Sequence, residues 1–427
     1  MHTKHLCLAL LAIVLSLGLQ SCLEDECTAT QTYTIWNPVL VTLDELRSEI
    51  QSSAPRELVN PGKFFYYNGY LLVNELNEGI HVIDNRDPKN PQPVSFLEIP
   101  GNVDMAVRDD VLYADMYIDV LSIDISDPTA ISVIDREEDV FANVFPINAN
   151  NEIITEWVET EETIEVACTD NRWNRGWFSR DFDLAISNVS AESSVLRGGG
   201  TSSSPNISVA GSLARFSALG DYLYVLDRNN VVTLDVTASL EVTSTQEVGW
   251  NIETIFPYDN NLFIGSDQGM FIYSLEDPAT PTFRSAFAHA RACDPVFVQD
   301  EIAYITLRSG SPCRGFTNQL DIVDVTDIES PELLRTHQME NPHGLSVQGD
   351  RLYLCEGEHG LKVLDISNAI TGNVDLLDQI NSVHAYDVIV LPQINLAMLV
   401  GEDGIYQYDT TDPASIQEIS VITVNRP

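Results

Sequence analysis

The stretch "VLSIDISDP", Val120 to Pro128, decides the fold because the chain repeats its pattern. Each copy is a short strand of alternating apolar residues that ends in an Asp and continues into a turn. The other copies are "IHVIDNRDP" at 80–88, "LDIVDVTDI" at 320–328, "LKVLDISNA" at 361–369 and "IYQYDTTDP" at 405–413. A phrase repeated at a regular spacing indicates a fold assembled from one supersecondary unit.

The full unit contains four short strands. Around the opening stretch the chain reads "VDMAV", "VLYADMY", "DVLSIDISDP" and "ISVID", with polar turn residues between the segments. The order recurs roughly every 40 residues. Its marker residue, the last of the third strand, is Asp84, Asp124, Asp235, Asp324, Asp365 and Asp409, with Ser274 in the same place in "FIYSLEDP".

These units predict an all-β fold, a β-propeller in which they stack radially. One four-stranded sheet cannot bury its apolar faces alone. The step from Asp124 to Asp235 is 111 residues, which is too long for one unit. Within them, "ANVFPINANNEIITEW" at 142–157 parallels "IETIFPYDNNLFIGSD" at 252–267. We therefore expect eight blades over residues 61–427, the third of them degraded and supplied by about 141–211. Seven blades with that segment looped outside is the alternative.

The marker aspartates have two interpretations. An Asp at this place can accept backbone N–H groups of the turn that follows it, while the Pro fixes the direction of the exit. A repeated calcium site is the other interpretation. One Asp per blade offers few oxygen ligands, and no D-x-D-x-D-G loop occurs, so the sequence favours the turn.

The N-terminus has the pattern of a signal peptide at residues 1–21. His2, Lys4 and His5 precede the apolar run "LCLALLAIVLSLGL", which is too short for a comfortable membrane span. The following "LQSC" resembles a bacterial lipobox, which implies a lipid on Cys22. Ordinary signal cleavage beside an incidental Cys is the alternative. The next residues, "LEDE" at 23–26, resemble the export tag of Bacteroidetes-type surface lipoproteins.

Residues 22–60 are predicted to form a tether and one short helix. Thr42 and Glu45 have the spacing of a capping box, in which each side chain bonds the backbone of the other residue.

The charge excludes one class of partner. The formal net charge is −42, and Lys4, Lys63, Lys89 and Lys362 are the only lysines. Nucleic acid binding needs many cations opposite the phosphates, so we expect no nucleic acid partner. An acidic surface suits a salty habitat, where charge repulsion is screened, and equally an acidic envelope protein of an ordinary host.

The repeats resemble those of LVIVD-repeat β-propeller proteins of bacterial envelopes. The resemblance rests on "GIHVIDNRDP", "DPVFVQDEIAYITLRSG", "NQLDIVDV", "NPHGL" and "GLKVLDIS", and spans about residues 60–415. It implies a fold and an export address, as a lipoprotein of the cell envelope and outer membrane. It implies no particular activity. The pattern dissolves at 159–211, which we interpret as an insert.

Three cysteines of the repeat region, Cys293, Cys313 and Cys355, have predicted roles. We expect a disulfide between Cys293 and Cys313, which precede and follow strands of one blade in an oxidising compartment; two free thiols is the alternative. Cys355 lies in an apolar strand and reads as a buried thiol. No ligand spacing typical of zinc occurs, so we expect no metal and no cofactor.

The insert contains "CTDNRWNRGWFSRDFD" at 168–183, where arginines alternate with aromatics. Such composition is typical of an interface loop, since Trp and Arg dominate binding energies. The candidate residues are Arg172, Trp173, Arg175, Trp177 and Phe178. A plug over one end of the ring is the alternative interpretation.

A second candidate site comes from aligning the units on their first strands. A polar residue stands near each start, namely Lys63, Asp104, Asn143, Arg215, Thr254, Asp294, His343 and Asp387. The innermost strands of a propeller line its axial channel, so these side chains are expected to ring one mouth of it. A solvated channel without a ligand is the alternative.

The sequence thus favours a lipid-anchored binding or scaffolding module outside the cytoplasm, with a protein or carbohydrate partner. A Ser-His-Asp catalytic site is not indicated, because no G-x-S-x-G elbow occurs. The rival class is an envelope hydrolase, for example a carbohydrate-active one, with two carboxylates at the channel mouth. A purely structural ring is the third possibility.

Changing Cys22→Ser should release the protein from membranes, because the lipid would be the only anchor of the mature chain. Fractionation of cells and labelling with a lipid probe measure this. A serine variant that still pellets with the envelope and still takes up the probe contradicts the prediction.

Overall fold

The computed structural model describes residues 28–48, 50–167, 208–210, 214–249, 251–266, 269–288, 295–309, 317–371 and 374–426. The chain divides into two compact units. One contains Met1–Leu40 with Glu156–Ala185, and the other contains Val41–Thr155 with Ile186–Pro427. The described residues contain no helix long and apolar enough to cross a membrane.

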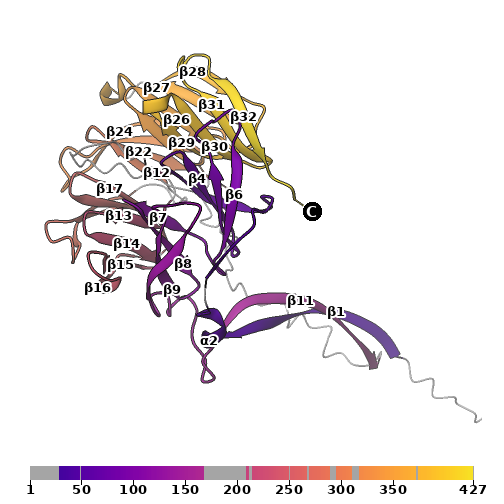
Figure 1. The fold of residues 1–427 in the computed structure, drawn as a ribbon. Coiled ribbons are helices and arrows are strands. Elements are labelled where there is room, and N and C mark those ends of the chain that lie inside the picture. The colour runs from indigo at the N-terminus through magenta and orange to yellow at the C-terminus, as the bar shows by residue number, and fades with distance from the viewer. Residues whose placement is uncertain are drawn as a thin grey trace, which may run out of the picture. The chain divides into compact units, whose positions relative to one another are not determined.

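The larger unit is a β-propeller of seven radial sheets (Figure 1). Blade 1 is β3 (Pro61–Tyr67), β4 (Tyr70–Glu75), β5 (Gly79–Asp84) and β6 (Gln92–Glu98). Blade 2 is β7 (Met105–Arg108), β8 (Val111–Met116), β9 (Asp119–Asp124) and β10 (Ser132–Glu137). Blade 3 is β13 (Phe216–Leu219), β14 (Tyr222–Asp227), β15 (Asn230–Asp235) and β16 (Glu241–Glu247). Blade 4 is β17 (Ile252–Tyr258), β18 (Asn261–Ser266), β19 (Gly269–Ser274) and β20 (Thr282–Ala288).

The last three blades continue the same order. Blade 5 is β21 (Val296–Gln299), β22 (Ile302–Leu307), β23 (Gln319–Asp324) and β24 (Glu332–Gln338). Blade 6 is β25 (Leu345–Gln348), β26 (Arg351–Cys355), β27 (Leu361–Asp365) and β28 (Asp375–Ile380). Blade 7 is β29 (Ala385–Leu391), β30 (Leu396–Gly401), β31 (Gly404–Asp409) and β32 (Gln417–Thr423). Two 3₁₀ turns, η1 (Ala369–Thr371) and η2 (Pro392–Ile394), lie in blades 6 and 7.

Burial follows the position of a strand in its blade. In β3 every residue is buried, because both faces of an inner strand are covered by neighbouring blades. In β16, an outermost strand, exposed and half-buried residues alternate. In every blade the fourth strand shifts register against the third, as at Val133/Asp135 opposite β9. Such bulges bend an outer strand and blunt the sheet edge.

The prediction of eight blades is wrong, and the seven-blade alternative is right. The segment expected to supply a third blade at 141–211 instead contributes β11 (Glu152–Ala167), which pairs with β1 (Thr28–Thr42) in a two-stranded sheet. Hydrogen bonds join Thr32 to Thr163 and Asn37 to Thr160, so the two strands run antiparallel. The physical reason is that β1, which the sequence analysis took for a tether, offers β11 a long partner strand.

Two further strands extend blade 1. Its sheet has the order β12-β3-β4-β5-β6-β2, with β2 (Gln51–Ser53) outermost and β12 (Ser208–Ala210) innermost. β12 pairs antiparallel with β3, with Val209 opposite Tyr66. It also contacts β7 and β29, the first strands of blades 2 and 7. The end of the insert therefore lies in the axial channel, beside three first strands.

The predicted short helix is present as α2 (Leu43–Leu46), with the capping box of Thr42 and Glu45 formed. Leu46 packs into the core of blades 1 and 2. Arg47 ends the helix and binds the buried Asp119 carboxylate through Nε and Nη2, each at 2.9 Å. Arg136 binds the same carboxylate at 2.9 Å, and these arginines hold the pKa of Asp119 below its usual value although its burial acts to raise it.

The turn interpretation of the marker aspartates is confirmed. Each marker carboxylate accepts the backbone N–H two residues further on, for example Ser126 at 2.8 Å from Asp124. The other acceptors are Asp84, Asp235, Asp324, Asp365 and Asp409, and Ser274 does the same with its hydroxyl. The described residues contain no group of three or more His, Cys, Asp or Glu that could hold a metal ion.

Because Ser274 replaces the marker Asp in blade 4, the turn needs an acceptor rather than a charge. We expect Asp235→Ser to leave the melting temperature closer to wild type than Asp235→Ala, since only serine keeps a bond to the Thr237 N–H. Thermal melts of the two variants test this. Equal destabilisation by both would contradict it.

Candidate functional site

Most of the residues predicted to ring the channel mouth lie at one end of the first strands. Lys63, Thr254 and Asp387 are in β3, β17 and β29, near their starts. Asp104, Arg215 and His343 stand one or two residues before β7, β13 and β25. Asn143 is an exception, because it lies in a turn between β10 and β11 rather than in a first strand. Its amide still lies 3.5 Å from the Asp227 carboxylate at the end of β14.

Other predicted residues lie outside the described residues. These are Cys22, the disulfide pair Cys293 and Cys313, Asp294, and the interface loop of Arg172, Trp173, Arg175, Trp177 and Phe178. They remain predictions. Cys355 is buried, as expected.

Blades 1 to 3 fill their part of the mouth with internal contacts. The Lys63 ammonium lies 3.3 Å from the Asp104 carboxylate, and both side chains are almost fully buried. The other bonds of this carboxylate come from the backbone N–H groups of Met105, at 2.7 Å, and Arg215, at 2.8 Å. This buried ion pair and its hydrogen bonds hold the first strands of blades 1, 2 and 3 together, and they leave little for a ligand to contact.

Asp115 supports this arrangement from the end of β8. Its Oδ1 accepts the backbone N–H groups of Val103, at 2.8 Å, and Asp104, at 2.9 Å, and the Asn102 amide at 2.7 Å. Burial raises the pKa of this carboxyl to about 6, against the opposing effect of those backbone bonds. Asp115 thus fixes the backbone that enters the first strand of its blade.

The same device recurs in other blades. Glu356, at the end of the second strand of blade 6, accepts the N–H groups of Glu340, at 2.9 Å, and Asn341, at 2.6 Å. Glu75 in blade 1 accepts those of Val59 and Asn60. Sequence reasoning missed this repeat, although an acidic residue closes "YLLVNE", "VLYAD" and "RLYLCE" alike.

Blades 5 to 7 bring a different chemistry to the mouth. Nη1 of Arg308 lies 2.7 Å from Nδ1 of His343, and the His343 ring lies 5.7 Å from that of Tyr386. The Tyr386 ring also packs against His384, at 4.8 Å, whose Nδ1 lies 2.9 Å from the Glu402 carboxylate. We call these five residues the mouth cluster. Burial raises the pKa of Tyr386, so its hydroxyl stays protonated.

Two glycines let this cluster pack closely. A Cβ on Gly344 would overlap the Asp387 carboxylate, and the Gly344 N–H donates to the Tyr386 carbonyl at 2.9 Å. Gly357 has a φ of +55°, and a Cβ there would meet His343 Nε2 at 3.0 Å. Of the cluster, only His343 was predicted. "NPHGL" carried the signal for Gly344, but nothing in the sequence pointed to Arg308, Tyr386, His384 or Glu402.

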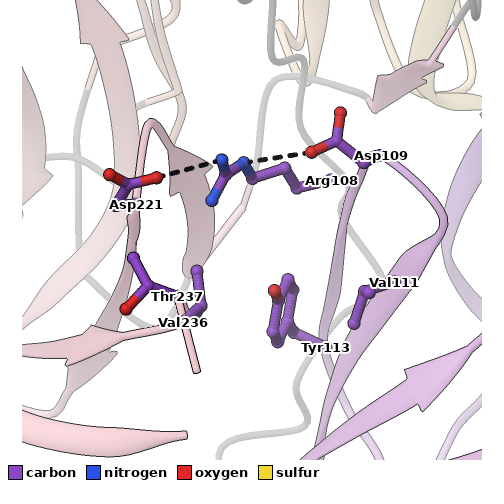
Figure 2. Close-up of a pocket in the computed structure, with 7 residues that line it drawn as sticks. All are labelled: Arg108, Asp109, Val111, Tyr113, Asp221, Val236 and Thr237. Carbon is purple, nitrogen blue, oxygen red and sulfur yellow. Dashed lines mark hydrogen bonds and ion pairs between the residues drawn. The ribbon is translucent and has the colours of Figure 1, made fainter. Parts of the chain in front are cut away.

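Two clefts open at the opposite end of the ring, where the first hairpins and the marker turns lie. One, of about 280 Å³, lies between blades 2 and 3 and is lined by Arg108, Tyr113 and Asp221 among others (Figure 2). The other, of about 300 Å³, lies between blades 7 and 1 and includes Arg86 and Asp409. Neither was predicted, because such clefts depend on the lengths of turns in adjacent blades.

Comparison with known proteins supports the repeat assignment. The model of the LVIVD repeat matches residues 210–239 and 342–369. The chain carries LVIVD repeats. The matched segments cover strands of blades 3 and 6. A search of the curated proteins finds no match.

Solved structures share the propeller fold at low sequence identity. A proposed 6-phosphogluconolactonase of Bacteroides fragilis is 9% identical, with a TM-score of 0.55 over 86% of this chain and 96% of that one. The periplasmic gluconolactonase of Pseudomonas aeruginosa is 12% identical, with a TM-score of 0.53 over 86% and 97%. A Lactobacillus plantarum protein is 13% identical, with a TM-score of 0.53 over 86% and 97%. These likenesses concern the fold alone.

Asp115 gives a paired prediction. Asp115→Asn keeps the Oδ1 acceptor of three donors and removes the buried charge, whereas Asp115→Ala leaves those donors without an acceptor. We expect the alanine variant to lose about 1–3 kcal/mol of unfolding free energy, and the asparagine variant much less.

The same pair predicts a pH dependence. The pKa of Asp115 is raised in the folded state, so the folded state holds this proton more tightly and its contribution to stability falls as pH rises from about 4 to 6. Asp115→Asn should remove that contribution. Urea unfolding between pH 4 and 7 measures it, and identical pH profiles for wild type and Asp115→Asn would contradict the assignment.

Proposed function

We propose that the protein is a lipid-anchored β-propeller outside the cytoplasm that binds an anionic group of a partner at the mouth of its axial channel. The mouth cluster, formed by Arg308, His343, His384, Tyr386 and Glu402, is the recognition site. The anchor is Cys22, and the address is the outer membrane of the cell envelope. This function requires no cofactor and no catalytic step.

The observation that carries the proposal is the chemistry of the cluster in so acidic a chain. An arginine and two histidines gather around one tyrosine, although the whole protein has 22 Lys and Arg residues against 64 Asp and Glu. Tyr386, His384 and Glu402 are all partly exposed, so a ligand can reach them. A guanidinium and imidazoles are suited to a carboxylate or similar anion.

Four carboxylates at the mouth end of the blades favour binding over hydrolysis. A glycoside hydrolase needs two carboxyl groups that face its substrate. Asp104, Asp115, Glu75 and Glu356 are buried and accept backbone N–H groups, which occupies their oxygens in holding strands. β12 also pairs along β3 inside the channel, which favours a ligand held at the mouth over one that enters deeply.

The test uses the full mature chain and its own envelope fraction. We expect cross-linked partner capture to fall at least roughly tenfold in Arg308→Gln and Tyr386→Phe variants, which lose a charge and a hydroxyl from the mouth. Arg335→Gln, on the outer strand β24, is the matched control and should capture as well as wild type. Melting curves verify that all variants fold.

Capture that is unchanged in the mouth variants contradicts the assignment of the site. Loss of capture in Arg335→Gln as well would show that the outer strands bind the partner. Turnover of a glycoside or lactone by the wild type, abolished by the mouth variants, would favour the hydrolase class instead.

A further inference from the structure

The cleft between blades 2 and 3 has a specific structural origin. Five residues separate the marker Asp235 from the start of β16 at Glu241, against seven between Ser274 and the start of β20 at Thr282. The longer turn of blade 4 contains "DP", which the blade 3 turn "VTASL" lacks. The shorter turn leaves room above the neighbouring blade, and the cleft of about 280 Å³ lies there.

Tyr113 lies in the cleft, and comparison with Tyr224 of blade 3 shows which hydrogen-bond acceptor the cleft lacks. In blade 3, Tyr224 is the third residue of its second strand, and its hydroxyl donates to the carbonyl of Pro278 in the longer turn, at 2.9 Å. Tyr113 holds the same place in blade 2. Tyr113 as a residue is 4% exposed, and in the described part of the chain its hydroxyl makes no hydrogen bond. A hydroxyl that lines a cleft and has no hydrogen-bond partner there is a group that a ligand can satisfy.

The rim of the cleft is polar and exposed, so a ligand can reach its side chains. Nη2 of Arg108 lies 3.2 Å from Asp221, and its Nε lies 3.5 Å from Asp109 (Figure 2). These carboxylates are 63% and 82% exposed, so the ion pairs are weak and can rearrange around a ligand. Val111 and Val236 line the cleft below them and are half-buried.

We propose that this cleft binds one pyranose ring of a carbohydrate. A sugar ring has an apolar face and hydroxyl groups at its edge, which matches valines and a tyrosine beneath a rim of guanidinium, carboxylates and the Thr237 hydroxyl. Two carboxylates beside one guanidinium disfavour an anion, and the guanidinium disfavours a metal ion. A neutral ligand is also not repelled by a chain of net charge −42.

The site is independent of the mouth cluster. It lies at the other end of the first strands, and no residue of the mouth cluster lines it. The cleft is open to solvent through its rim, so it can hold a terminal sugar of a longer glycan as well as a free monosaccharide.

The experiment titrates the full mature chain with methyl glycosides of glucose, galactose, mannose and N-acetylglucosamine, followed by saturation-transfer NMR. We expect at least one to bind, and Arg108→Gln or Tyr113→Phe to weaken that binding roughly tenfold. Replacing 236–240 by the longer turn 275–281 should abolish binding, because the graft supplies the proline carbonyl and fills the cleft. Tyr304→Phe, the same change at the same strand position in blade 5, is the control and should bind like wild type.

Binding of no glycoside at any accessible concentration overturns the proposal, as does binding that the turn graft leaves intact. A parallel titration with oligosaccharides of the preferred sugar distinguishes the source: tighter binding of oligomers indicates a glycan, and equal binding indicates a free monosaccharide. The mouth variants Arg308→Gln and Tyr386→Phe should not change the affinity for sugar, so failure here and failure of the proposed function are separate results.

Discussion

The closure of the ring is the constraint on which the rest of the structure depends. The inner strands are mostly buried by their neighbours, so a gap between blades 7 and 1 would expose two sheet faces. At this seam the side-chain amides of Asn85 and Gln407 donate to each other, at 2.9 and 2.8 Å, and both are fully buried. Leu58 and Val424, which precede blade 1 and follow blade 7, form a parallel bridge. The seam therefore closes by side chains and one bridge, without a blade built from both ends of the chain.

Acidic residues hold this ring together from within. The marker aspartates accept turn N–H groups at one end of the blades, and Glu75, Asp115 and Glu356 accept N–H groups of the entering backbone at the other. Some of the many acidic side chains thus serve as acceptors for backbone N–H groups. These positions explain why acidic residues recur in register with the repeat, and why the mouth carboxylates are poor candidates for catalysis.

The four-stranded blade could be predicted from the sequence, whereas the number of blades in the ring could not. Strand alternation, the marker Asp and the capping box of Thr42 and Glu45 act over a few residues, so they were readable and correct. The blade count failed because β1 and β11 pair across more than a hundred residues, which no local pattern records. For the same reason only part of the candidate site could be predicted. His343 stands at a strand start, whereas Arg308 and Tyr386 reach it from other blades.

The pairing of β12 with β3 constrains the order in which the blades can be completed during synthesis. Val209 pairs with Tyr66 in the innermost position of blade 1, so this pairing closes a loop of more than a hundred residues that includes all of blade 2. Loop closure of that length costs entropy before any contact repays it, and such non-local pairings form slowly. Blade 1 can assemble its four sequential strands early, yet its inner edge stays unpaired until the chain up to residue 210 is available. The first blade to be synthesised can therefore be completed only after the strands of blade 2 have been made.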